Sequence, residues 1–484
     1  MPQLQAERKT IRYAWRVLSV TSVGAFLTAI NNSTLNVALP VIARHFHATA
    51  TEASWILLSY MLVNTVLILT FGRLADILGR RKLYLAGLAL LTVASLACGL
   101  APSAPVLIAL RVVQAVGGAC VVTNTTPLLA DAFPSRLLST GLGLNVTIVS
   151  AAAVLGPVVG GFFATALGWR WVFWFNVPIG ILGLGWAALT LRRMPTRASR
   201  EPFDIVGALL SLVVVGTLVV ALSEGGALGW TTTPVLAAFA VFVLAVPLFC
   251  WTQWRRSHPL VDLGLFAYRE RAMAYLATFM NSAARSAVVL LVSLYVQAAH
   301  GSDAFHAGLQ VVTVALGMMA ASPVAGRLAI RLPARVVSTA GLFLSAASLA
   351  ALAFLIGPNM SELAIALLLA VIGIGSGLFL TPNTSSIMAG VPAGRRGVAN
   401  GVRSMLQNAA RVTSTALVLA IITGALPQHA KAAAYAGELS HLPAPLLGVF
   451  TNSYRVAFAV LAVLAAIGMV ASLLRSPRRV NTPY

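Results

Sequence analysis

The sequence predicts an all-helical integral membrane protein, from its composition and from the length of its apolar segments. Of its 484 residues, 59% are hydrophobic and only 9% are charged, whereas soluble domains carry about 45–50% and about 25% respectively. So few charges cannot cover the surface of a soluble chain of this length, and we therefore expect the solvent to be largely lipid. Lipid satisfies no backbone hydrogen bonds, which excludes open strands and leaves helices.

Fourteen segments are apolar and long enough to cross a bilayer, which takes about 20 helical residues. We read each as one membrane-spanning helix. They cover residues 15–39, 52–71, 83–101, 104–130, 139–166, 170–192, 205–223, 234–254, 272–297, 307–330, 336–356, 361–389, 398–424 and 451–474.

The net charge of +21 would suggest a nucleic-acid partner in a soluble protein. The positions of the basic residues along the sequence show whether that interpretation applies here. The basic residues occur as short runs between apolar segments, for example Arg80-Arg81-Lys82 and Arg192-Arg193. No basic face with interleaved aromatic residues is present. We therefore expect no nucleic acid and predict contact with membrane lipids.

The basic residues also predict the orientation of the chain. With the N-terminus inside, 25 of the 33 Lys and Arg residues fall in the tails, loops and span ends on the inner side. Four lie in loops or span ends on the other side, at Arg44, Arg170, Lys431 and Arg455, and four lie deeper within spans. The positive-inside rule then predicts a multi-pass protein of the cell membrane with both termini in the cytoplasm.

An internal repeat divides the chain. Gly-Arg-Leu-Ala begins at Gly72, after the second span, and again at Gly326, after the tenth and 254 residues later. We therefore predict two pseudo-symmetric six-helix bundles with two helices inserted between them, the arrangement of many secondary transporters. The predicted parts are an N-tail (1–14), an N-terminal bundle (15–192), linkers with the inserted helices (193–271), a C-terminal bundle (272–474) and a C-tail (475–484).

The segment Gly72–Lys82 resembles the loop signature of the major facilitator superfamily. Its glycines permit a tight turn between helix ends, and Asp76 can cap a helix or pair with an arginine. The arginines can hold a helix C-terminus or a lipid headgroup. The resemblance implies a gating loop, which we define as Gly72, Arg73, Asp76, Gly79, Arg80 and Arg81. Simple positive-inside anchoring remains the alternative.

Five further segments carry the same resemblance. Leu107–Ala119 looks like the family's second motif and implies coupling or substrate roles for Arg111 and Gln114. Gly156, Pro157, Gly160 and Gly161 resemble the antiporter motif of exporters, in which Pro157 kinks the helix and the glycines allow close packing. Trp169–Gly180, Pro259–Asp262 and Leu380–Asn383 are similar to the fourteen-helix drug:proton antiporter branch. Taken together, the resemblance covers nearly the whole chain.

The sequence departs from the family at positions that matter for coupling. The resemblance implies an Asp where Asn31 stands, and an amide does not titrate. All twelve acidic residues lie in tails, loops or helix ends, so Asp131, Asp76 and Glu224 are the remaining proton-coupling candidates. A structural role for these boundary acids is the alternative.

Arginines within the spans suggest the character of the pathway. An arginine at the centre of a span costs about 2.5–3.5 kcal/mol on insertion scales and normally faces the protein interior. We hypothesise a positively biased cavity that suits anionic, zwitterionic or neutral substrates better than cations. Binding to helix carbonyls, or snorkelling of Arg403, is the alternative. The coupling or substrate candidates are Arg111, Gln114, Asp131, Asn31, Asn32, Asn145, Asn281, Arg285, Arg403, Gln407 and Arg411.

The functional prediction is a secondary transporter that exports small organic molecules by alternating access, with protons as the coupling ion. The alternative is a dedicated exporter of an anionic, zwitterionic or lipid-like metabolite with weak or no proton coupling. An integral-membrane enzyme would need a catalytic or metal site, and neither His45 and His47 nor His300 and His306 has converging carboxylates. The three cysteines lack metal or disulfide spacing. We therefore expect no enzyme activity, no metal and no cofactor.

Overall fold

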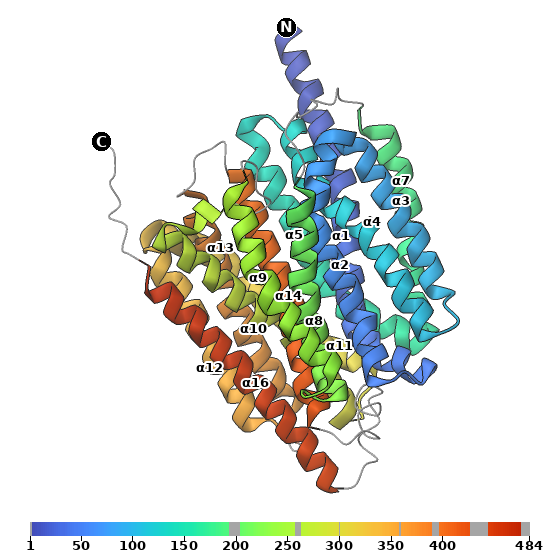
Figure 1. Cartoon of the computed structure of the whole chain (residues 1–484). Helices are drawn as coiled ribbons and strands as arrows, with labels where there is room; N and C mark the ends of the chain where they lie inside the picture. The colour runs from blue at the N-terminus through green and yellow to red at the C-terminus, as the bar shows by residue number, and fades with distance from the viewer. Residues whose placement is uncertain are drawn as a thin grey trace. The chain divides into compact units, whose positions relative to one another are not determined.

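A computed structural model describes residues 2–192, 204–256, 263–299, 301–357, 360–389, 396–425 and 444–475 of the chain. Within these ranges the regular secondary structure is helical, and fourteen helical segments are long and apolar enough to cross a membrane. The predicted fold class and number of spans are confirmed. Figure 1 shows the helices in chain order.

The first six spans are formed by α1 to α7, because the sixth span is broken into a short and a longer helix. A π-helical segment, η1 (Phe163–Leu167), directly follows α5. The helices are α1 (Pro2–Phe46), α2 (Ala50–Leu78), α3 (Arg80–Gly99), α4 (Ala104–Ala132), α5 (Ser135–Phe162), α6 (Trp171–Trp174) and α7 (Asn176–Thr190).

The remaining eight spans are single helices, and the first two of them are the predicted inserted pair. A short 3₁₀ segment, η2 (Leu263–Phe266), precedes α10. The helices are α8 (Ile205–Leu228), α9 (Thr233–Arg255), α10 (Arg269–Ala299), α11 (Ala304–Arg331), α12 (Ala334–Leu355), α13 (Glu362–Ala389), α14 (Arg396–Gly424) and α16 (Ala444–Leu473).

Local sequence signals set the ends of α2. Thr49 accepts a hydrogen bond from the backbone N–H of Glu52, whose side chain bonds back to Thr49, so a capping box begins the helix. At the other end Gly79 has φ of 96°, which glycine adopts without steric cost, and α3 begins at the next residue. Residues 72–78 are helical, so the predicted loop between spans is in structural terms a turn at Gly79.

The described helices fall into two compact units. The first contains α1 to α7, α8 as far as Val219, and Val296–Leu309; the second contains the other described residues. In the first unit α3 packs on α4 and α7, and in the second unit α12 packs on α13 and α16. Because α12, α13 and α16 are the third, fourth and sixth helices of their half, the two units repeat the same pairings, as the internal repeat predicts.

Equivalent arginines extend this repeat to side chains. Arg81, at the start of α3, donates from Nε to the carbonyl of Leu191 at 2.7 Å and from Nη2 to that of Ala188 at 3.0 Å. Arg335, 254 residues later at the start of α12, donates from Nη1 to the carbonyl of Arg475 at 3.0 Å. In each half, an arginine therefore binds carbonyls at the C-terminal end of the last helix.

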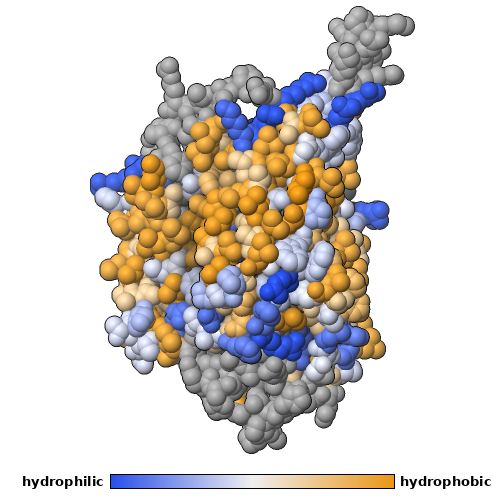
Figure 2. Space-filling model, turned by 90° about the vertical axis from the view of Figure 1, so that its right-hand side faces the viewer, coloured by the Kyte–Doolittle hydropathy of each residue, from blue (hydrophilic) through white to orange (hydrophobic). Residues whose placement is uncertain are grey.

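The surface of the helices is suited to lipid. Large apolar side chains are strongly exposed along them, including Leu189 of α7 at 85% and Val93 of α3 at 64%. Figure 2 shows a broad hydrophobic zone between hydrophilic groups near both ends of the face it draws. A soluble protein rarely exposes so large an apolar area, so this surface is the lipid-facing side of a multi-pass membrane protein.

Candidate functional site

A buried polar cluster lies among the first four helices. Arg111 of α4 is 1% exposed, and its Nη1 donates to Gln114 Oε1 at 2.5 Å and to Asn31 Oδ1 of α1 at 3.5 Å. Its Nε donates to the carbonyl of Ile56 in α2 at 3.3 Å, and its guanidinium lies 4.3 Å from the ring centroid of Tyr60. Hydrogen bonds and the aromatic ring together compensate the buried charge.

Gln114 connects the same cluster to a further helix. Its Nε2 donates to Ser95 Oγ of α3 at 2.8 Å and to Asn31 Oδ1 at 3.3 Å. Arg111 and Gln114 are three residues apart and therefore lie on one face of α4. Each described partner in this cluster is an amide, a hydroxyl, a carbonyl or a ring. The cluster can hold α1 to α4 together, but it presents no carboxylate that could exchange a proton.

The antiporter-motif glycines of α5 are sites of close backbone approach. An added Cβ at Gly160 would lie 2.5 Å from the carbonyl oxygen of Thr34 in α1, and one at Gly161 would collide with the carbonyl of Ala304 in α11. On the same stretch, the carbonyl of Pro157 lies against Gly308 of α11. The motif thus lets α5 pack directly on α1 and on the first turns of α11.

The gating loop is held by its arginines. Arg80 Nη1 forms an ion pair with Asp131 Oδ2, at the end of α4, at 2.6 Å. Arg81 binds the end of α7, as described above. The backbones of Gly72, Arg73 and Asp76 lie in the last turns of α2, while their side chains lie outside the described part of the structure.

The second unit carries polar residues along one face of α14. Arg403 Nη1 donates to Gln407 Oε1 at 3.0 Å, and Arg411 follows one helical turn later on the same face. Arg285 of α10 and Arg411 are both partly exposed. Asn281, one turn before Arg285, is 3% exposed.

The other predicted residues are separate from these groups. Asn32 donates to the carbonyl of Thr28 in its own helix at 3.0 Å. Asn145 of α5 is buried, and its Nδ2 has no hydrogen-bond partner among the described residues. The predicted motif at residues 259–262 lies outside the described residues.

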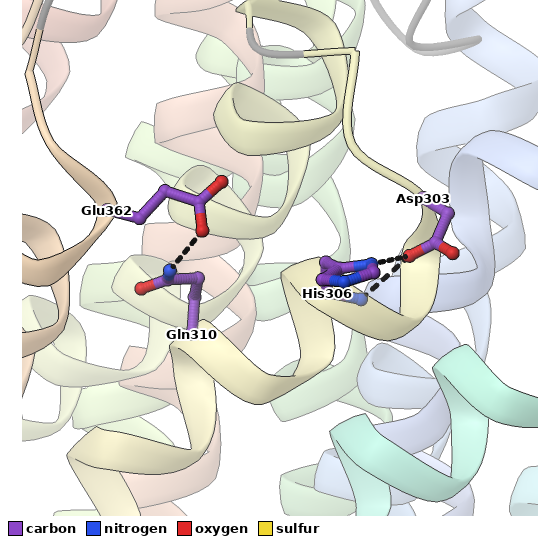
Figure 3. Close-up of polar contacts among 4 residues, drawn as sticks. All are labelled: Asp303, His306, Gln310 and Glu362. Atoms are coloured by element: carbon purple, nitrogen blue, oxygen red, sulfur yellow. Dashed lines mark hydrogen bonds and ion pairs between the residues drawn. The ribbon is translucent and has the colours of Figure 1, made fainter.

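Sequence reasoning assigned no site role to three polar pairs. Asn383 of α13 donates to Thr278 Oγ1 of α10 at 2.7 Å. Near the start of α11, Asp303 accepts hydrogen bonds from the backbone N–H of His306 at 2.8 Å and pairs with its ring at 2.7 Å (Figure 3). Figure 3 also shows Gln310 donating to Glu362 at 3.0 Å. An Asp three residues before a helical His is an N-cap signal that could have revealed one of them.

The sequence as a whole matches one family. The profile of the Major Facilitator Superfamily aligns with residues 21–257 and 274–483, which is most of the chain. The chain belongs to the major facilitator superfamily. Membership in this superfamily makes the protein a multi-pass transporter of small molecules rather than an enzyme, and it agrees with the resemblance inferred from the motifs.

Several curated relatives in the superfamily are resistance proteins. The chain is 34% identical over 388 residues to the multidrug resistance protein Stp of Mycobacterium tuberculosis, covering 80% of this chain and 72% of that protein. It is 33% identical over 332 residues to a methylenomycin A resistance protein of Streptomyces coelicolor, covering 68% and 70%. A riboflavin transporter, RibZ of Clostridioides difficile, is 27% identical over 421 residues, covering 87% and 91%.

Solved structures support the superfamily fold. A POT family transporter in complex with 5-aminolevulinic acid matches with a TM-score of 0.67 at 17% identity, over 95% of this chain and 96% of the other. Another structure of a POT family transporter, in complex with a thioalcohol-conjugated peptide, matches with a TM-score of 0.68 at 16% identity, with the same coverage. At such identities the likeness concerns the fold alone.

Proposed function

We propose that this major facilitator protein exports small organic molecules, including drugs, from the cytoplasm across the cell membrane, with both termini inside. The observation that carries the proposal is the set of resistance and export proteins among its relatives, of which Stp covers 80% of the chain. The asymmetry of Lys and Arg between the two sides supports the orientation.

Alternating access is the mechanism we propose. The N-terminal bundle (15–192) and the C-terminal bundle (272–474) would rock about a central site, so that the pathway opens to one side at a time. Two contacts at opposite ends of α5 suit such a mechanism. The glycine stretch packs on α11 at one end, and the gating loop, through Arg80 and Asp131, lies near the other.

Proton coupling is part of the proposal, with Asp131, Asp76 and Glu224 as the groups to test. Asp131 pairs with Arg80 at the boundary, so loss of its negative charge would release the gating loop. The second candidate function is a dedicated exporter of an anionic, zwitterionic or lipid-like metabolite with weak or no proton coupling. The observation that favours it is the Arg111 cluster, where an amide, Asn31, takes the place of an acid.

The test is uptake of a compound panel, including antibiotics and riboflavin, into inverted membrane vesicles, with the pH gradient and the membrane potential imposed independently. Proton-coupled export predicts uptake that follows the pH gradient and falls strongly in Asp131→Asn. Uptake that ignores the pH gradient would favour the dedicated exporter. Absence of uptake for every compound would contradict export.

A further inference from the structure

The second inserted helix, α9, is the most exposed of the described spans. Only 17% of its apolar stretch is buried, the smallest share among them. Four of its exposed residues, Leu244, Leu248, Trp251 and Arg255, lie within about 60° of one another around the helix axis, because an α-helix turns about 100° per residue. We call these four residues the α9 stripe.

The α9 stripe changes in chemical character from the middle of the span to its end. Leu244 lies near the middle of the span Thr233–Arg255, and Arg255 ends it. The helix rises about 16 Å between these two residues, which is about half of the hydrocarbon thickness of a bilayer and therefore one leaflet. Leucines, an indole ring and a guanidinium follow one another in this direction. They match the acyl chain, the interfacial region and the headgroup of a phospholipid in the same order.

Arg255 is held by the tryptophan and not by a polar partner. Its guanidinium lies 4.9 Å from the ring centroid of Trp251, and its side chain has no hydrogen-bond or ion-pair partner among the described residues. Arg81 and Arg335 differ from it, because their donors bind carbonyls at helix ends. The donors of Arg255 therefore remain available to a ligand, while the ring restricts where the guanidinium lies.

The charge at this end of α9 distinguishes between lipid headgroups. The helix contains no acidic residue, and Arg256 adds a second positive charge directly after Arg255. Both arginines repel the ammonium group of a zwitterionic headgroup, whereas a headgroup with a net negative charge is attracted. A phosphate also accepts two parallel, charge-assisted hydrogen bonds from one guanidinium.

We propose that the α9 stripe binds a phospholipid with a net negative headgroup. Arg255 holds the phosphate, Trp251 contacts the glycerol region, and an acyl chain lies along Leu248 and Leu244. In the proposed orientation this lipid belongs to the cytoplasmic leaflet. The site does not depend on which molecules the protein exports, and it gives a function to an inserted helix that has no counterpart in the internal repeat.

Cys250 provides a position for a probe beside the α9 stripe. It is exposed, whereas Cys98 and Cys120 are buried, so a maleimide fluorophore labels the full chain there in detergent. The labelled protein is reconstituted into phosphatidylcholine vesicles. Quenching of the fluorophore is then measured with rising fractions of spin-labelled phosphatidylglycerol or of spin-labelled phosphatidylcholine with the same acyl chains. The variants are Arg255→Gln and Trp251→Leu.

Two matched controls separate the site from general effects of the membrane interface. Trp254→Leu removes an indole that is 85% exposed, against 52% for Trp251, but lies beside the α9 stripe and not on it. Arg455→Gln removes a charge from the same unit at an arginine bonded to the carbonyl of Ile356. If α9 only carried part of a general aromatic belt, Trp254 would matter at least as much as Trp251.

We expect spin-labelled phosphatidylglycerol to quench the unmodified protein at an about fivefold lower fraction than spin-labelled phosphatidylcholine, the ratio typical of one basic residue acting on an anionic lipid. Arg255→Gln should abolish this preference. Trp251→Leu should weaken it about twofold or more, because the guanidinium loses the ring that positions it. Both controls should keep the preference of the unmodified protein.

Equal quenching by the two lipids, a preference that survives Arg255→Gln, or a loss as large in Trp254→Leu as in Trp251→Leu would overturn the site. A second copy of the chain is the other candidate occupant of this face of α9. Energy transfer between donor and acceptor labels at Cys250 that persists when the protein is diluted in lipid would show that a second copy covers the α9 stripe. That result would also overturn the proposal.

Discussion

At the scale of single residues, the same residue type has two different environments in the two units. Arg111 is enclosed, and its donors are matched with acceptors from α1, α2 and α4. Arg285 is partly exposed, and its side chain has no hydrogen-bond or ion-pair partner among the described residues. The sequence placed both within spans but could not distinguish them, because the spacing of residues in one helix does not reveal which acceptors a neighbouring helix presents.

Replacing Gln114 tests whether the Arg111 cluster is structural. Gln114→Leu removes the acceptor of the shortest hydrogen bond of Arg111 and the amide that donates to Ser95. The loss should destabilise the protein by about 1–3 kcal/mol. Asn32→Leu is the matched control, because among the described residues the Asn32 side chain bonds only to a carbonyl of its own helix. Thermal unfolding in detergent measures both. Equal stabilities of the two variants would contradict a structural role for the cluster.

Asp303 should make the start of α11 sensitive to acid. Burial alone would raise the pKa of its carboxyl, but hydrogen bonds from the backbone and ring of His306, together with the charge of that ring, give a net lowering of the pKa. For an acid whose folded pKa is lowered, the stabilisation is present above the unfolded pKa of about 4 and is lost as pH falls through the folded pKa.

Hydrogen exchange of the first turns of α11 measures this effect. Near neutral pH, Asp303→Asn should exchange faster there than the unmodified protein, because the acceptor for the N–H of His306 is weakened. Below the folded pKa the two proteins should converge. A difference that stays constant down to strongly acidic pH would show that the carboxylate charge is not involved.

At the scale of elements, the contact of α5 with its neighbours tests whether the antiporter-motif glycines serve close helix packing. Gly161 lies against the backbone of Ala304. An added Cβ would collide with these backbone atoms, which cannot move aside as the end of a flexible side chain could. Gly161→Ala should therefore push α5 and α11 apart, lower the melting temperature and reduce transport. Gly185→Ala is the matched control, because an added Cβ there meets nothing within 4 Å and alanine favours the helix. Similar behaviour of the two variants would contradict close packing as the role of the motif.

Element boundaries show where the sequence was less informative. The glycines at 72 and 79 predicted a loop, but only Gly79 breaks the helix. A glycine can remain helical within a membrane-spanning helix. Which of several glycines adopts a positive φ depends on the local backbone, and the residue type alone does not reveal it. Likewise α1 extends well beyond its apolar segment at both ends, because a helix does not have to end where the bilayer does.

At the scale of the whole molecule, the repeat predicted from the four-residue sequence Gly-Arg-Leu-Ala extends to the hydrogen bonds of equivalent side chains. Arg81 and Arg335 bind carbonyls at the ends of α7 and α16. We expect Arg81→Gln and Arg335→Gln each to increase hydrogen exchange at the end of the helix its arginine binds, since the donor charge is lost. Increased exchange at unrelated helix ends, or none in either variant, would contradict the equivalence.

Fold class, span number and repeat followed from the sequence because lipid imposes helices of a fixed length on apolar segments. The candidate site followed only in part. Residue types within spans, such as Arg111, were identified, but the acceptors that Arg111 meets on α1 and α2 depend on packing between helices distant in the sequence. Asn383 and Thr278 were not paired for the same reason.

In alternating access the pathway opens to the two sides in turn. We propose that the contact of α5 with α11 is present when the pathway is open to one side and absent when it is open to the other. Spin labels at Phe162 and Leu309, which are 49% and 46% exposed, measure this contact by pulsed electron resonance in a cysteine-free background. Alternating access predicts two distance populations, the longer of which grows or shrinks when a transported compound or a pH gradient is applied. A single short distance under all conditions, in protein that still transports, would contradict it.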